Sequence, residues 1–265
     1  MKEANLIVEV RDARGPAITS PTRYLGASTT PRLVILTKSD LADPTLTRAW
    51  VEHGHPDAKQ VMALDLSGRG KAGDHLLRVL NGFVGKVKSS LGIVRAVVVG
   101  LPNVGKSTLI NRIRKASVAR VGDQPGVTRG KMWVQVGQRC FVLDTPGIIQ
   151  VSQELMRRAK DQAWKLSLLN IVPENAMDAE ETVDGFLRFL LERPQLVKDA
   201  RFREYLAEAQ QPVDVLVAMA KDSGSRTRGG IPDVETSARR LIGKFRKLEL
   251  GRISLDDLRD TGALA

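Results

Sequence analysis

The chain has 265 residues, of which 42% are hydrophobic and 27% charged, and this length allows one large core and a smaller second one. Its single cysteine, Cys140, excludes an intramolecular disulfide. The sequence has neither a signal peptide nor an apolar run of about 20 residues, which predicts a cytoplasmic protein that does not bind membranes. The formal net charge of +11 favours a polyanionic partner, and the excess lies in the first 170 residues, which carry 26 Lys+Arg against 13 Asp+Glu.

Four short apolar runs, rich in branched side chains, alternate with helical patterns in the first two-thirds of the chain. They cover residues 6–10, 33–36, 94–99 and 140–143. Each run is too short for an ordinary helix and has the composition of a buried strand. Residues 1–170 are therefore predicted to form an α/β domain with a doubly wound, mostly parallel sheet, in which ligands bind at the carboxyl ends of the strands.

The tetrapeptide Thr37-Lys38-Ser39-Asp40 directly follows the second of these runs. The Asp40 carboxylate can accept hydrogen bonds from the ring N–H and the exocyclic amine of guanine, while the Lys38 stem lies along the base. Adenine presents the wrong donors for this arrangement. A four-residue match is weak by itself, because lysine and aspartate often share a solvated turn. The prediction of a guanine site therefore depends on a phosphate loop elsewhere in the chain.

Residues 100–107, Gly-Leu-Pro-Asn-Val-Gly-Lys-Ser, match the complete phosphate-loop pattern and lie between the third apolar run and a helical pattern. Backbone N–H groups of such a loop surround a pyrophosphate, Lys106 reaches the outer phosphates, and the Ser107 hydroxyl ligates Mg²⁺. An ordinary glycine-rich turn is the alternative, but the order of strand, loop, Lys-Ser and helix favours the phosphate site. The predicted phosphate-binding residues here are Gly100, Pro102, Asn103, Val104, Gly105, Lys106, Ser107 and Thr108.

A second motif expected beside the phosphates, Asp144-Thr145-Pro146-Gly147, follows the last apolar run. We expect Asp144 to act on Mg²⁺ through water and the Gly147 N–H to contact the γ-phosphate. Thr128, in the polar segment 122–131, is predicted to supply the hydroxyl that closes over Mg²⁺ in the triphosphate state. Taken alone, residues 144–147 are at least as consistent with a simple turn.

After about residue 170 the sequence indicates helices and no strands. Asp178 and Glu181 form a capping box ahead of an amphipathic stripe that stops at Pro194, and Asp233 can cap a last long helix. Residues 171–265 are therefore predicted to form a small all-α domain. A basic stretch within residues 237–252 predicts an RNA contact, to which basic residues of the first domain, including Arg112, are expected to add; the alternative is a solvated face. The predicted RNA-binding residues are Arg239, Arg240, Lys244, Arg246 and Lys247.

The guanine motif precedes the phosphate loop, the reverse of the usual order, so the chain resembles a circularly permuted GTPase of the TRAFAC class. Such a permutation keeps the site intact, because the ligand-binding loops share one edge of one sheet. The chain is similar to the YlqF/RbgA family of ribosome-assembly GTPases in its motifs at 12–14, 37–40, 100–108, 122–128, 144–147 and 243–247. The resemblance implies GTP and GDP as ligands, Mg²⁺-dependent GTP hydrolysis coupled to maturation of the large ribosomal subunit, and an rRNA partner for the helical tail.

Several positions depart from the family pattern. The Trp-Phe-Pro-Gly-His-Met segment that usually precedes the first strand is expected to be absent, since Met1 is only five residues from Leu6. Thr37 replaces an asparagine whose amide braces the phosphate loop. Asp65 replaces a serine at the contact to the guanine carbonyl, which the resemblance assigns to the Leu66 N–H. Asn103 is similar to the asparagine that ligates K⁺ in potassium-using members of the superfamily, and a turn asparagine bonded to its own backbone is equally consistent.

No side chain in the sequence is an evident catalytic group for water activation. Ile148 occupies the position where many GTPases carry a water-orienting glutamine, and the three histidines, at positions 53, 55 and 75, fall beside the base-reading half. The catalytic residue therefore stays unassigned, and slow hydrolysis without a partner is expected. One alternative is a nucleotide-dependent scaffold with little hydrolysis. Another, a GTPase of tRNA modification or of membranes, lacks the support of a Cys/His metal set or an amphipathic membrane helix.

Overall fold

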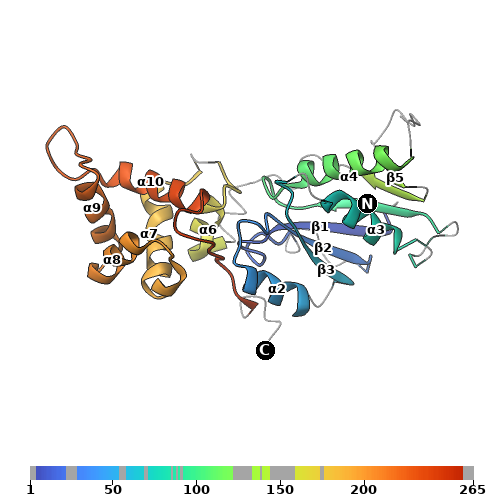
Figure 1. Ribbon diagram of the computed structural model, residues 1–265, viewed down its shortest axis with the longest axis horizontal. Helices are drawn as coiled ribbons and strands as arrows, with labels where there is room; N and C mark the ends of the chain where they lie inside the picture. The colour runs from blue at the N-terminus through green and yellow to red at the C-terminus, as the bar shows by residue number, and fades with distance from the viewer. Residues whose placement is uncertain are drawn as a thin grey trace. The chain divides into compact units, whose positions relative to one another are not determined.

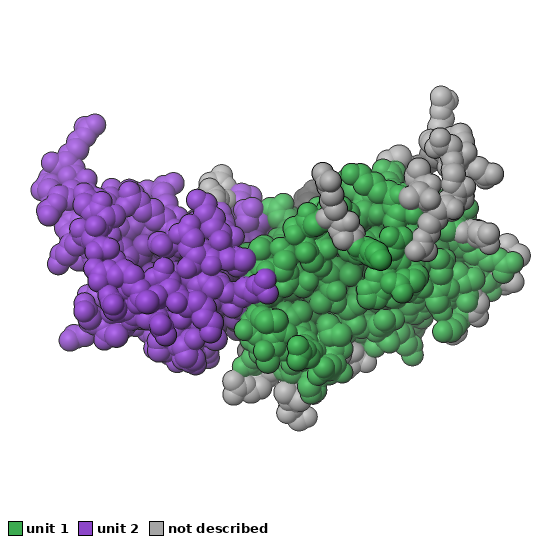
Figure 2. All heavy atoms as spheres, in the orientation of Figure 1, with its two compact units in different colours: residues 1–150, 256–265 green, residues 151–255 purple. Residues whose placement is uncertain are grey.

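The chain folds into two compact units, residues 1–150 with 256–265, and residues 151–255 (Figure 2). The computed structural model describes residues 4–21, 29–53, 58–68, 71–84, 86–87, 89, 92–121, 133–137, 139–143, 159–173 and 176–258. The division falls earlier than the expected boundary at residue 170, because helix α6 (Ala163–Leu168) packs against helix α7 (Ala179–Leu191) of the second unit. No pattern in the sequence predicted that residues 256–258 belong to the first unit.

The first unit is built on a six-stranded sheet with the order β3-β2-β1-β4-β6-β5. The strands are β1 (Leu6–Asp12), β2 (Arg32–Thr37), β3 (Gln60–Leu64), β4 (Val94–Val99), β5 (Trp133–Gly137) and β6 (Cys140–Leu143). Neighbouring strands are parallel except for the antiparallel pair β5–β6. The predicted mostly parallel α/β sheet is confirmed. The edge strands β3 and β5 were missed, because the apolar run of β3 contains a single β-branched residue, Val61, and β5 is interrupted by Gln135 and is mostly only partly buried.

Three helices described in the first unit pack against this sheet: α2 (Pro44–His53), α3 (Ala72–Asn81) and α4 (Lys106–Val121). Figure 1 shows α2 and α4 on opposite sides of the strands, as the doubly wound arrangement requires. Trp50 of α2 is buried in a cluster with Val34, Leu36 and Val61 of the strands beneath it. Helices α3 and α4 approach so closely at Gly73 that a Cβ there would lie 2.5 Å from the backbone oxygen of Arg112.

The second unit contains α6, α7, α8 (Ala200–Glu208), α9 (Pro212–Asp222) and α10 (Val234–Arg246), with short 3-10 turns η1 (Lys160–Gln162) and η3 (Pro194–Leu196). Asp178 and Asp233 cap α7 and α10 by accepting hydrogen bonds from the backbone N–H groups of Glu180 and Thr236. The core includes an edge-to-face contact of Phe186 with Phe245, whose ring centroids are 5.3 Å apart. In the described part of the chain, no helix is long and apolar enough to cross a membrane.

Candidate nucleotide-binding site

The sheet brings the two predicted nucleotide motifs to one edge. Strand β1 lies between β2 and β4 and is parallel to both, with Asp12 beside Thr37 and Glu9 beside Val99. The carboxyl ends of all three strands therefore point the same way. The guanine motif that follows β2 and the phosphate loop that follows β4 meet at this edge although 59 residues separate them in sequence.

The phosphate loop has the backbone expected of a close anion cradle. A Cβ at Gly100 would lie 2.5 Å from the Val10 carbonyl oxygen, so only glycine permits this approach to β1. Asn103 and Gly105 adopt left-handed φ angles of 55° and 99°, and α4 begins at Lys106. The loop is anchored by the buried side chains of Leu101 and Val104. The backbone thus directs the start of α4 and its N–H groups towards the loop's interior.

Lys106 and Ser107 occupy the first turn of α4. The Lys106 ammonium donates a hydrogen bond of 2.6 Å to the carbonyl oxygen of Leu101, folding back over its own loop. Ser107 is exposed. A hydroxyl at the start of a helix next to a phosphate loop is a suitable hard oxygen ligand for Mg²⁺. The predicted Mg²⁺ partners Thr128 and Asp144, together with Gly147 and Ile148, lie outside the described residues.

Thr37 joins the two halves of the site. Its side chain is fully buried, and its hydroxyl lies 3.0 Å from the Arg11 carbonyl oxygen and in even closer contact with the Val104 carbonyl oxygen. A hydroxyl has a single hydrogen to donate, so the two carbonyls share it or alternate. Thr37 stands where the related family was expected to have a bracing asparagine, and its hydroxyl links the end of β2 directly to the phosphate loop.

Lys38, the next residue, is held by a buried carboxylate. Its ammonium lies 2.9 Å from Asp12, whose side chain is inaccessible to solvent, and its own φ is 56°. Arg14 also binds Asp12, through its backbone N–H at 3.0 Å and its guanidinium at 2.8 Å. Burial alone would raise the pKa of Asp12, but Arg14 and Lys38 outweigh it and hold that pKa below its usual range. Asp12 therefore stays ionised and fixes the direction of the Lys38 side chain.

The loop after β3 carries Asp65 and Leu66, which were predicted to lie at the guanine end of the site. Asp65 accepts hydrogen bonds from the hydroxyl and the backbone N–H of Ser67, at 2.6 and 2.7 Å, which lower its pKa, and Asp40 also interacts with it. Arg112 of α4 donates to the Leu66 carbonyl oxygen at 2.9 Å. The structure thus brings Asp40 and Asp65 together, and it gives Arg112, expected on an RNA surface, a role in bracing the loop that carries Leu66. Arg112 and Leu66 are 46 residues apart in sequence, so no local pattern could predict this hydrogen bond.

A buried ionic cluster beneath the site was also missed. Glu9 receives Arg11 at 2.6 Å and Arg32 at 2.8 Å, and all three side chains are almost inaccessible. Asp256, also buried, accepts a hydrogen bond of 2.8 Å from the Ile18 N–H and acts electrostatically on Arg11. The sequence does contain a signal for this cluster, namely Glu9 and Arg11 within the mainly apolar strand β1, because a charge on a buried strand requires a partner.

Two of the three histidines, none of which was expected to reach the γ-phosphate, lie in the described part of the chain. His53 at the end of α2 and His75 on α3 are both exposed, and the His53 ring nitrogen Nδ1 bonds to the Ala49 carbonyl oxygen of its own helix. Neither is brought to the phosphate loop by an observed contact. His55 lies outside the described residues.

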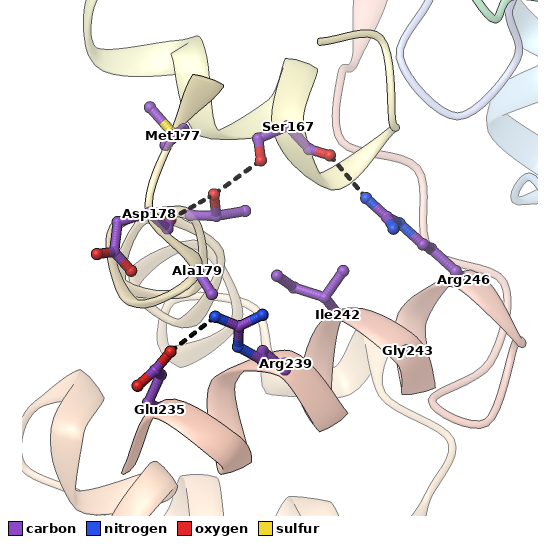
Figure 3. A pocket seen from close by; sticks show the side chains of 10 residues that line it. Ser167, Met177, Asp178, Ala179, Glu235, Arg239, Ile242, Gly243 and Arg246 are labelled. Atoms are coloured by element: carbon purple, nitrogen blue, oxygen red, sulfur yellow. Dashed lines mark hydrogen bonds and ion pairs between the residues drawn. The ribbon is translucent and has the colours of Figure 1, made fainter. Parts of the chain in front are cut away.

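The five predicted RNA-binding residues lie on α10 and just after it. In Figure 3, Arg239 and Arg246 border a cavity of about 580 Å³ between α10 and the start of α7. Arg239 is paired with Glu235 at 2.7 Å, and Arg246 donates to the carbonyl oxygens of Ser167 and Leu168. The other three do not line this cavity: Arg240 donates to the Ser223 hydroxyl at 2.7 Å, Lys244 pairs with Glu249 at 3.2 Å, and Lys247 is exposed.

Comparison with known proteins agrees with this geometry. Residues 95–221 match the family model described as "50S ribosome-binding GTPase". Ribosome biogenesis GTPase A of Bacillus licheniformis is 33% identical over 98% of this chain and 93% of that protein, and its Bacillus cereus namesake is 30% identical over 99% and 89%. The structure entitled GDP-bound YlqF superposes with a TM-score of 0.67 at 25% identity, covering 97% of this chain and 96% of that one. A GNP-bound YlqF structure from Thermotoga maritima gives a TM-score of 0.64.

Proposed function

Because the chain belongs to the YlqF/RbgA family of ribosome biogenesis GTPases, we propose that it uses GTP hydrolysis to assist assembly of the large ribosomal subunit through contacts to rRNA. The chain is a GTPase by membership of this family. One observation supports the proposal most directly. The guanine motif and the phosphate loop share one edge of the sheet, and the Thr37 hydroxyl connects them.

In the proposed site, each end of the nucleotide has its own set of groups. Asp40 accepts the two guanine hydrogens, the Lys38 stem covers the base while Asp12 holds its ammonium, and the Leu66 N–H contacts the guanine carbonyl. At the other end, backbone N–H groups of residues 100–108 surround the phosphates. Lys106 leaves the Leu101 carbonyl for a phosphate oxygen, a stronger acceptor because it is ionised.

A cation completes the phosphate end in this proposal. Ser107 would hold Mg²⁺ directly, with Thr128 and with Asp144 through water, and the ion would neutralise charge on the phosphate oxygens. Asn103 has the left-handed backbone of a turn asparagine and an exposed side chain. Its amide oxygen is our candidate ligand for K⁺, and faster hydrolysis in K⁺ than in Na⁺, abolished by Asn103→Ala, would support that assignment.

The helical unit would supply the rRNA contact through the basic residues of α10. Phosphate recognition by arginine and lysine suits this unit, because only 4% of the chain is aromatic and base stacking on such a surface is limited. The proposal is tested by single-turnover GTP hydrolysis with and without purified large subunits, alongside co-sedimentation in GDP and in a GTP analogue. Tight binding without any hydrolysis under either condition would instead support a nucleotide-dependent scaffold.

A further inference from the structure

The connection between α9 and α10 is an ordered hairpin of residues 223–233. Arg226 and Pro232 form an antiparallel bridge, the Thr227 N–H donates to the Ile231 carbonyl at 2.9 Å, and the Gly230 N–H closes the turn onto Thr227. Gly230 supplies the left-handed φ of 77° at this turn. Figure 1 shows the segment standing away from α9 and α10. The hairpin is thus held by its own backbone and does not bury a face against the helices.

The hairpin lies within a part of the unit whose charge is opposite to that of the preceding helices. Residues 171–220 contain 5 Lys+Arg and 10 Asp+Glu, whereas residues 221–247 contain 8 and 3. The three acids are engaged locally: Asp222 binds Arg201 and Tyr205, Asp233 caps α10, and Glu235 pairs with Arg239. Glu235 offsets Arg239, and Glu249, just beyond this range, offsets Lys244, but residues 221–247 still carry eight cations against three acids.

The arginines on two sides of α10 have different partners. Arg239 and Arg246 border the cavity and are tied to Glu235 and to main-chain carbonyls. Arg240 lies on the other side and binds Ser223, at the base of the hairpin. Lys244 and Lys247 follow Arg240 at spacings of four and seven residues, which places them on the same side. The Arg240 side of α10 therefore carries three cations, and Arg240 joins this side to the base of the hairpin through Ser223.

We infer that the hairpin, through Arg226 and Arg228 together with Arg240 and Lys247, binds the phosphate backbone of double-helical RNA. This inference rests on the proposed function and identifies the part of the helical unit that would contact rRNA. Backbone hydrogen bonds within the hairpin hold Arg226 and Arg228 on one short segment, and duplex RNA is recognised through its shape and phosphates. Aromatic side chains are absent from residues 221–244, which disfavours single strands bound by stacking. Of the five residues predicted from sequence to bind RNA, Arg240 and Lys247 would contact the duplex, whereas Arg239 and Arg246 on the cavity side would not.

Arg228 is the best position for the test, because no hydrogen bond or ion pair of its side chain is observed among the described residues, whereas Arg226 also braces the hairpin by donating to the Gly230 carbonyl. The full chain, held in GDP, is titrated onto a fluorescent RNA duplex of about 20 base pairs at several KCl concentrations. Arg228→Ala should weaken binding about three- to tenfold and reduce the slope of log K against log salt by about 1, and Arg228→Lys should recover most of both. Arg240→Ala should behave similarly.

The matched controls are Arg203→Ala, an exposed arginine of the acidic helices, and Arg239→Ala on the cavity side, which should each change the affinity less than twofold. If Arg240→Ala and Lys247→Ala weaken binding but Arg228→Ala does not, the hairpin inference is wrong while the proposed RNA contact stands. If the parent chain does not bind the duplex or large subunits, the proposed function fails as well. If Arg228→Ala weakens binding to large subunits only, the hairpin contacts a ribosomal protein and the RNA assignment is overturned.

Discussion

The Lys38 ammonium lies 2.9 Å from the carboxylate of Asp12, which joins the end of β2 to the end of β1. Asp12 is inaccessible to solvent and is also bound by Arg14. Lys38 is thus the partly exposed end of a buried ionic group. Lys38, which we propose covers the guanine base, owes its direction to a residue from another strand, and this dependence can be measured.

Asp12→Asn should lower both stability and nucleotide affinity, because it leaves Arg14 and Lys38 without their buried counter-charge. We expect a loss of about 3 kcal/mol in the free energy of unfolding at neutral pH, measured by urea titration, and a GDP affinity at least tenfold lower. Arg203→Ala, which removes an exposed charge far from this group in sequence, serves as the control. Unchanged GDP affinity in a folded variant would contradict the positioning of Lys38 by Asp12.

The same pair predicts a pH dependence. The pKa of Asp12 is lower in the folded than in the unfolded chain, so its contribution is fully present above the unfolded pKa of about 3.9 and is lost as the pH falls through the folded pKa. The stability difference between the parent and Asp12→Asn should therefore be constant from about pH 5 to 8 and shrink below about pH 4. A difference that grew on acidification would show that Asp12 is not stabilised as an anion.

Thr37→Val keeps the shape of the side chain but removes the hydrogen donated to the carbonyls of Arg11 and Val104. Losing this buried hydrogen bond costs about 1–3 kcal/mol, and part of this cost should appear as a five- to tenfold loss of GDP affinity. Thr37→Ser retains the hydroxyl and should bind GDP nearly as well as the parent in isothermal titration. Equal affinity of the valine variant would remove the link between the two halves of the site.

Asp40→Asn should shift the base preference of the protein from guanine towards xanthine. The amide presents a donor where the carboxylate presented only acceptors, so GTP affinity should fall at least tenfold while affinity for xanthosine triphosphate rises. Asp43→Asn, three residues further along the same loop, is the matched control. The competition assay uses a fluorescent GDP analogue, and GTP affinity equal to that of the parent would refute the assignment of the base site to Asp40.

Hydrolysis by the isolated chain should be slow. Ile148 cannot orient a water molecule, and we expect acceleration of roughly 10³ or more only when large subunits supply a group in trans. Single-turnover rates with and without subunits measure this directly. A fast basal rate unaffected by subunits and by alanine at positions 53, 55 and 75 would reveal a catalytic element within the chain.

The sequence by itself determined the nucleotide chemistry and most of the fold. A phosphate loop depends on local features, namely glycines, Lys-Ser and a strand-helix junction, so residues 100–107 were recognisable without tertiary information. The central strands were predicted because most of their residues are apolar and buried, so each reads as a short, mainly apolar run. The caps Asp178 and Asp233 were predictable for the same local reason, since a cap acts on N–H groups two or three residues away.

Only the tertiary structure decided which distant side chains support that chemistry. Arg112 braces the loop of Leu66, and Asp12 directs Lys38. Asp256 accepts a hydrogen bond from the backbone N–H of Ile18, 238 residues earlier in the chain. The tertiary fold also separated Arg239 and Arg246 of α10, which border a cavity, from Arg240, which contacts Ser223 at the base of the hairpin. These relationships escape a sequence pattern because an ion pair or hydrogen bond depends on a few ångströms of distance, and for residues far apart in sequence that distance is set by strand order and helix packing.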